Sequence, residues 1–147
     1  MNTTTQRLLE DLKESGERIT TVRRALIQIL SKDHKPLSVQ EILKKLKSSA
    51  IAANKTTVYR QLETLLKYNF VHEVRLADRS VLYELANGED HHHHLVCLGC
   101  GSIEDVSFRD DLERQEKNIV KSKKFKIVRH SLEFFGWCLK CQKKYGK

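Results

Sequence analysis

Long apolar runs and export signals are absent from this sequence of 147 residues. No stretch approaches the length of a membrane span, and the N-terminus lacks the apolar core of a signal peptide. Apart from a run of histidines there is no internal repeat or low-complexity tract, and Pro36 is the only proline. We therefore expect a cytoplasmic protein that has no contact with a membrane.

Cysteine is scarce as well, and its placement is informative. The only four cysteines form two Cys-x-x-Cys pairs, Cys97/Cys100 and Cys138/Cys141. Two intervening residues let both sulfurs of a pair reach one ion, so the matched pairs predict a structural zinc site of four thiolates. Buried thiols that pair by chance, or two redox-active pairs, are the alternatives. A disulfide scaffold is disfavoured because the chain carries no export signal.

The overall balance of charge is basic, with a formal net charge of +8 and 39% hydrophobic residues. This composition can build one or two small domains and leaves a surface suited to polyanions. Solubility alone would give the same balance, so charge does not identify the partner.

Four consecutive histidines, His91 to His94, stand just before the first cysteine pair. Successive side chains of an extended chain point to opposite faces, so His91 and His93 face one way and His92 and His94 the other. Four adjacent histidines fit one ion poorly but can contribute to two metal sites back to back. A solvated polar loop is the alternative.

The first half of the chain reads as four helices followed by a hairpin. Residues 3–15 read as a helix with one apolar stripe. Thr20, Ser38 and Asn54 can cap three further helices, and Glu41 completes a capping box with Ser38. Residues 70–74 and 81–85 read as strands joined by a turn at 77–80. This order predicts a winged helix whose fourth helix enters the DNA major groove.

The fourth helix carries its basic and polar residues opposite its buried stripe. Thr56, Arg60 and Lys67 lie nearly opposite the apolar positions, with Tyr59 on the flank. Lysine and arginine here would neutralise phosphates, while Tyr59 and Arg60 would contact bases. An ordinary solvated helix face is the alternative.

Residues 87–90 are a polar, glycine-containing hinge between two predicted domains, a winged-helix domain at 1–86 and a metal-binding dimerisation domain at 91–147. The second domain reads as strands at 102–108 and 125–135 around a helix from 110 to about 122. So small a set of elements cannot stand alone, and we expect zinc and a partner subunit to complete it. The predicted fold class is α+β, with a small C-terminal α/β dimerisation domain.

Seven stretches together resemble the ferric uptake regulator (Fur) family of metal-responsive DNA-binding repressors. They occur in the family's order and span nearly the whole chain. They are residues 18–23 (RITTVR), 37–41 (LSVQE), 57–60 (TVYR), 81–84 (VLYE), 91–101 (HHHHLVCLGCG), 130–132 (HSL) and 136–141 (GWCLKC).

The resemblance implies roles for individual residues. Tyr59 and Arg60 match the family's base- and backbone-reading pair, and Arg18 falls where a basic residue reaches the minor groove. With Thr56, Thr57 and Lys67 they make up the expected DNA-binding set. The implied metal sites are the structural zinc site Cys97, Cys100, Cys138 and Cys141, a hinge regulatory site Glu84, His92, His94 and Asp105, and a dimerisation-domain site His91, His93, Glu113 and His130.

The sequence also departs from the family pattern. Pro36 stands where the hinge site often takes a further histidine, so either His34 substitutes or the site has one ligand fewer. The unbroken histidine run resembles the zinc-sensing branch, but the hinge lacks the cysteine that many zinc sensors use, and Ala86 stands near that place. Imidazole and carboxylate ligands serve Zn²⁺, Fe²⁺ and Mn²⁺ alike, so the regulatory metal stays open.

We therefore predict a homodimeric repressor that binds a pseudo-palindromic operator when metal-loaded and has no small-molecule substrate. A zinc-ribbon adaptor that binds nucleic acid without sensing metal is the alternative. A zinc enzyme is disfavoured, because four thiolates close the coordination shell and the deaminase signature is absent.

Overall fold

The computed structural model describes residues 3–33, 35–75, 80–86, 92–107, 110–128, 130 and 132–145. The chain divides into two compact units, Met1–Ala86 and Asn87–Lys147. The predicted hinge at 87–90, most of the predicted turn at 77–80, and His34 and His91 lie outside the described residues. Within the described part, no helix is both long and apolar enough to cross a membrane.

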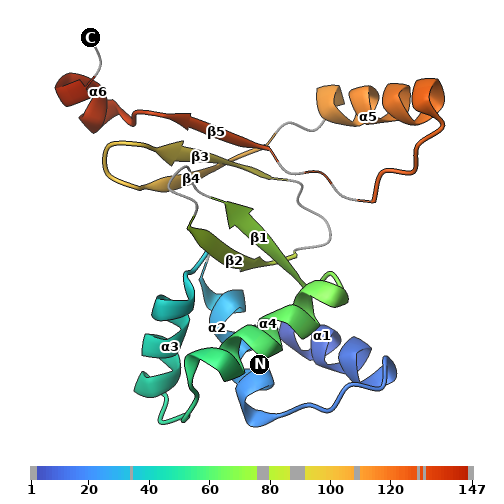
Figure 1. Ribbon diagram of the computed structural model, residues 1–147, viewed down its shortest axis with the longest axis vertical. Helices are drawn as coiled ribbons and strands as arrows, with labels where there is room; N and C mark the ends of the chain where they lie inside the picture. The colour runs from blue at the N-terminus through green and yellow to red at the C-terminus, as the bar shows by residue number, and fades with distance from the viewer. Residues whose placement is uncertain are drawn as a thin grey trace. The chain divides into compact units, whose positions relative to one another are not determined.

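The first unit consists of helices followed by an antiparallel hairpin (Figure 1). The predicted caps are confirmed, because Thr20, Ser38 and Asn54 each accept a hydrogen bond from the backbone three residues on, and Glu41 closes the capping box. The elements are α1 Thr3–Glu14, α2 Thr21–Lys32, α3 Val39–Ser48, α4 Lys55–Lys67, β1 Val71–Arg75 and β2 Val81–Leu85.

An aliphatic core joins the helices to the hairpin. Leu12 of α1, Leu26 of α2, Ile42 of α3 and Leu62 of α4 are all fully buried, and Val71 extends the core into β1. Burying each such side chain contributes about 1.5–3 kcal/mol, so tertiary packing rather than helix propensity holds these short helices.

The hairpin is tied to the helices by backbone bonds as well. Leu37, in the α2–α3 connection, exchanges two 2.8 Å hydrogen bonds with Tyr83 of β2. A hairpin that closes a set of helices in this way is the wing of a winged helix, as the sequence predicts.

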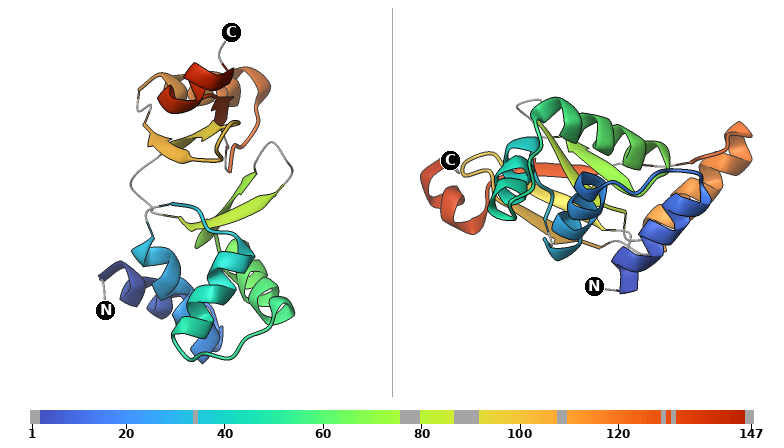
Figure 2. Two further views of the ribbon diagram at one scale, coloured as in Figure 1. Left: turned by 90° about the vertical axis from the view of Figure 1, so that its left-hand side faces the viewer. Right: turned by 90° about the horizontal axis from the view of Figure 1, so that it is seen from below.

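The second unit is built on a three-stranded sheet of order β4-β3-β5. The strand β3 starts within the histidine run, and it pairs antiparallel with β4 and parallel with β5. Figure 1 and the right-hand view of Figure 2 place α5 and α6 at opposite ends of this sheet. The elements are β3 His93–Cys97, β4 Ile103–Val106, α5 Asp110–Lys123, β5 Glu133–Gly136 and α6 Leu139–Tyr145.

The prediction of a strand over residues 125–135 is wrong. Among the described residues of that range only Glu133–Phe135 belong to a strand, and Phe125 and Val128 are 62% and 79% exposed. The parallel partner β3 has only five residues and pairs through His94–Cys97, so it offers no ladder to the earlier part of the range. The alternating pattern there reflects apolar side chains that this chain alone does not bury.

Candidate metal centre and DNA-binding surface

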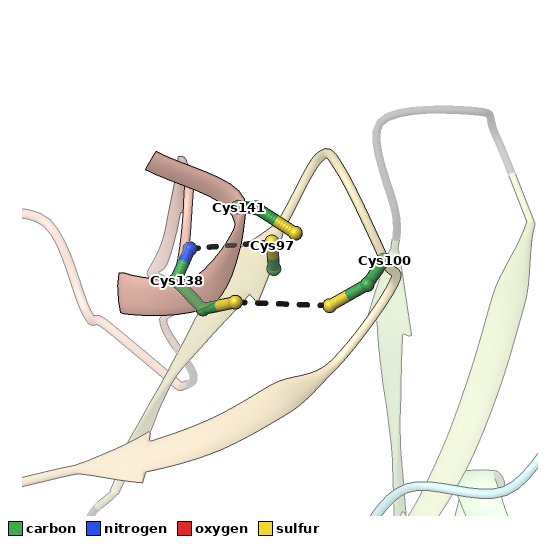
Figure 3. Close-up of side chains that lie close together, drawn as sticks. All are labelled: Cys97, Cys100, Cys138 and Cys141. Atoms are coloured by element: carbon green, nitrogen blue, oxygen red, sulfur yellow. Dashed lines mark hydrogen bonds between the residues drawn. The ribbon is translucent and has the colours of Figure 1, made fainter. Parts of the chain in front are cut away.

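The two cysteine pairs, far apart in the sequence, converge in the second unit (Figure 3). The four Sγ atoms of Cys97, Cys100, Cys138 and Cys141 all lie within 4.8 Å of one another. All four cysteines are free, and the Cys100 and Cys138 sulfurs are 3.8 Å apart, far beyond a disulfide bond. Two thiolates each about 2.3 Å from a tetrahedral zinc are about 3.8 Å apart, so this donor set fits that ion.

Two tight turns place the sulfurs. After Cys97 ends β3, the chain reverses through a turn in which the Gly101 amide donates to the Cys97 carbonyl at 2.8 Å. Gly101 has a φ of +70°, which favours glycine there. The second pair uses the start of α6, where the Cys141 amide donates to the Cys138 carbonyl at 2.8 Å.

The thiols differ in acidity because their surroundings differ. The Cys138 amide donates to the Cys97 sulfur at 3.2 Å, and this bond lowers the pKa of Cys97 to about 6. Hydrogen bonding to Ser102 lowers the pKa of Cys100. Burial, together with the neighbouring thiols, raises the pKa of Cys141 to about 12. A bound cation would favour the thiolate form of Cys141 at neutral pH.

Gly99, between the first two cysteines, allows the close approach of the second pair. A Cβ added at Gly99 would lie 2.8 Å from the Cys141 sulfur and 3.1 Å from the Tyr145 ring. The close approach of the second cysteine pair therefore favours glycine at position 99, inside the first pair.

The described histidines of the second unit divide between two neighbourhoods. The rings of His92 and His94 meet edge to face at 5.1 Å, whereas the His93 ring lies 5.3 Å from that of His130. His93 and His94 are both buried. The imidazole Nε2 of His94 is 3.8 Å from the carboxylate of Asp105, its register partner on β4. This division follows the alternation of side chains along a strand.

The carboxylate beside His130 is one that sequence reasoning missed. Glu116 of α5 lies 2.6 Å from His130 Nδ1, whereas the predicted Glu113 forms an exposed ion pair with Lys117 at 3.7 Å. Glu113 and Glu116 are one helical turn apart on α5, so the sequence pattern alone cannot choose between them.

The remaining predicted ligand, Glu84, belongs to the first unit. It lies on β2, half-buried, opposite His72 of β1. Neither the spacing nor the resemblance assigns a role to His72.

All the predicted DNA-binding side chains except Arg18 lie on one helix. On α4, Thr56, Tyr59, Arg60 and Lys67 are exposed and Thr57 is half-buried, while Val58, Leu62 and Leu65 face the core. Lys55 places its ammonium 5.8 Å from the centre of the Tyr59 ring. Arg18, in the α1–α2 connection, is exposed. The helix thus offers a basic and polar face to a polyanion.

These features define the class of protein: a winged-helix protein with a separate unit rich in thiols and histidines. Comparison with known proteins identifies the family within that class. The family model described as the ferric uptake regulator family matches residues 14–135. A ferric uptake regulation protein of Bacillus subtilis is 34% identical over 143 residues, covering 94% of each chain. That of Helicobacter pylori is 30% identical over 138 residues, covering 93% of this chain and 90% of the relative.

A solved structure agrees with these sequence matches. The structure of the Helicobacter pylori ferric uptake regulator, described as revealing three functional metal-binding sites, superposes with a TM-score of 0.76. It is 28% identical in sequence and the match covers 95% of this chain and 92% of the other. The chain belongs to the ferric uptake regulator family. It is a metal-responsive DNA-binding transcriptional repressor that acts as a homodimer, and its family comprises regulators rather than enzymes.

Proposed function

We propose that this repressor senses its metal through Glu84 of the first unit and His92, His94 and Asp105 of the second. The observation that carries the proposal is the sorting of the histidines, with His92 beside His94 and both apart from the His93–His130 neighbourhood. Asp105 adds a carboxylate near His94. Imidazole nitrogens and carboxylate oxygens suit Zn²⁺, Fe²⁺ and Mn²⁺, and His34 is a further candidate ligand.

Two further metal sites are proposed from the kinds of donor atom that lie together. The four thiols would hold a structural zinc ion, which supplies cross-linking between β3 and α6. A further site would use His91, His93 and His130 with a carboxylate of α5, either Glu113 or Glu116. The 2.6 Å contact with His130 favours Glu116.

DNA binding is assigned to the exposed side of α4 and to Arg18. Arg60 and Tyr59 would contact base edges, while Thr56, Thr57, Lys67 and Arg18 would contact the backbone or the minor groove. Two copies of this winged helix in a homodimer would meet two half-sites of a pseudo-palindromic operator.

Regulation would be a shift between arrangements of the two units. Ligands drawn from both units favour the arrangement in which they can converge, and by no more than the difference in metal affinity between arrangements. The arrangement so favoured is the one that binds operator. We assign this DNA-binding repressor to the cytoplasm. We assign it no enzymatic activity, because four thiolates leave no open coordination position at the zinc site.

The test compares neighbouring histidines of the same run. His92→Ala and His94→Ala should each abolish metal-dependent DNA binding, because each removes a ligand shared between the units. His91→Ala and His93→Ala should blunt the response without erasing it. The measurement is DNA affinity with and without Zn²⁺, Mn²⁺ or Fe²⁺, on protein shown by elemental analysis to keep one structural zinc per chain.

The DNA for this test is a duplex that the metal-loaded protein selects from a randomised library. Four variants that behave alike would mean that the histidines serve one shared site or none. That result would remove the proposed sensing mechanism while leaving the family assignment intact.

A further inference from the structure

The winged helix contains a buried arginine that is itself neither a predicted metal ligand nor a predicted DNA contact. Arg23 of α2 is only 6% exposed. Its Nη1 donates to the Glu17 carboxylate at 3.0 Å and to the Arg18 carbonyl at 2.7 Å. Its Nε donates to the side-chain oxygen of Gln61, on α4, at 2.8 Å. A guanidinium is costly to bury, and it is tolerated here because its Nε and Nη1 donors meet fixed acceptors.

The same network reaches the far end of α4. The Tyr68 hydroxyl, at the C-cap of α4, donates to the second oxygen of the Glu17 carboxylate at 3.2 Å. The α1–α2 connection is therefore joined to α4 directly, from Glu17 to Tyr68, and through Arg23 of α2, which bonds both the Arg18 carbonyl and Gln61. We call Arg23, Glu17, Gln61 and Tyr68, together with the carbonyl of Arg18, the Arg23 network.

The network acts on the backbone that carries Arg18. Upstream, the chain leaves α1 through Gly16, which takes a φ of +80° that favours glycine. Downstream, Thr20 caps α2. Between these points the bond from Arg23 fixes the Arg18 carbonyl while the Arg18 side chain stays exposed. At the other end of the Arg23 network, Gln61 lies on α4 directly after Arg60 in the sequence.

We propose that Arg23 is a positioning residue that sets the distance between Arg18 and the exposed face of α4, so that both engage one duplex together. The inference rests on the proposed DNA-binding role of Arg18 and α4. Arg23 is too deeply buried to contact DNA, so its effect reaches DNA only through Arg18 and through Gln61. An aliphatic residue could fill the same volume in the core, but it could not hold the carbonyl of a DNA-contacting residue.

The test is a double-mutant cycle on the full-length, metal-loaded homodimer, with a duplex that the wild-type protein selects from a randomised library. Arg23→Lys keeps the charge but loses the planar fork. It should lower affinity about tenfold when Arg18 is present and less than about twofold in an Arg18→Ala background, a coupling within the range measured for linked residues. Gln61→Leu, which cuts only the α4 end, should couple to Arg18 in the same sense.

A second readout is the dependence of affinity on salt. Arg23→Lys removes no charge, yet it should reduce the slope of log affinity against log salt by as much as Arg18→Ala does, by about one. Ile42→Val serves as the control, because it loosens the same core from α3, which contributes no residue to the network, and it should show no coupling to Arg18. Thermal unfolding of each variant reports the folded fraction, and Gln61→Leu carries the test if Arg23→Lys does not fold.

Losses that simply add in the double mutants, or a salt slope left unchanged by Arg23→Lys, would overturn the positioning role and leave the DNA-binding proposal standing. Failure of the wild-type protein to select any duplex would overturn both.

Discussion

Gly99 shows how a single side chain controls the thiol cluster. The change Gly99→Ala would place a Cβ 2.8 Å from the Cys141 sulfur, a distance at which the sulfur must move. Because a structural zinc site depends on its fixed geometry, we expect zinc affinity to fall about 10- to 100-fold, as when the support of a ligand is lost. Competition with a chromogenic chelator measures this.

Gly136→Ala is the matched control for that change. A Cβ at Gly136 meets nothing within 4 Å, and its carbonyl would still accept from the Leu98 amide. Zinc affinity should therefore stay unchanged in this variant. Equal losses in the two variants would show that the strand backbone, and not the approach of Cys141, sets the affinity.

Two glutamates one turn apart on α5 give a second prediction for single residues. Glu116 contacts His130 at 2.6 Å, whereas Glu113 is paired with Lys117 at the surface. Glu116→Gln should lower the affinity of the site that includes His93 and His130, because a carboxylate ligand is replaced by an amide. Glu113→Gln should leave it unchanged. Titration with Mn²⁺ or Zn²⁺ into protein holding its structural zinc distinguishes them, and the reverse order would restore Glu113 as the ligand.

At the scale of the element, α4 separates burial from DNA contact on its two sides. Arg60→Ala should weaken binding of the selected duplex by about 1–3 kcal/mol and relax its sequence preference, because Arg60 is assigned to base edges. Lys67→Ala should weaken all duplexes alike and lower the salt slope by about one, since a lysine at a phosphate carries no sequence information.

The measurement for α4 is affinity over a series of salt concentrations, for the selected duplex and a scrambled one. Both variants should unfold at the wild-type temperature, because both side chains are exposed. Unchanged binding by Arg60→Ala across the series would show that α4 is not the helix that reads DNA.

At the scale of the whole molecule, the protein is a homodimer, and the exposed apolar side chains of the second unit give a physical reason for dimerisation. Apolar side chains stay exposed along α5, the segment after it and β5, including Val120, Phe125, Val128 and Phe134. A monomer rarely leaves so many neighbouring apolar groups in water. Val128→Glu or Phe134→Glu should shift the protein towards monomer, because a charge would be buried in the interface. Analytical ultracentrifugation measures the dissociation constant.

Lys13→Glu, on α1 of the first unit, is the control for the dimer, since it introduces the same acidic side chain at an exposed position. It should leave the dimer intact. If Val128→Glu and Phe134→Glu dimerise as tightly as Lys13→Glu, the subunits associate through another surface.

Much of this protein follows from its sequence because the deciding interactions are local. The helix caps at Thr20, Ser38 and Asn54 depend on residues three positions apart, and the buried stripe of α4 follows from helical periodicity. The two cysteine pairs predict their cluster because a pair of ligands with two residues between them is itself a local motif. The sorting of the histidines needs only the alternation of an extended chain.

Only the tertiary structure decided what depends on distant neighbours. The short β5, in place of the predicted strand over 125–135, is limited by the pairing that β3 offers. The choice of Glu116 rather than Glu113 beside His130 depends on how α5 is placed, and no periodicity contains that information. Arg23 reads in the sequence as one more basic residue of a helix, and its role emerges only when α4 and the α1–α2 connection meet around it. Pairings over such separations are set by the packing of whole elements, which local pattern does not encode.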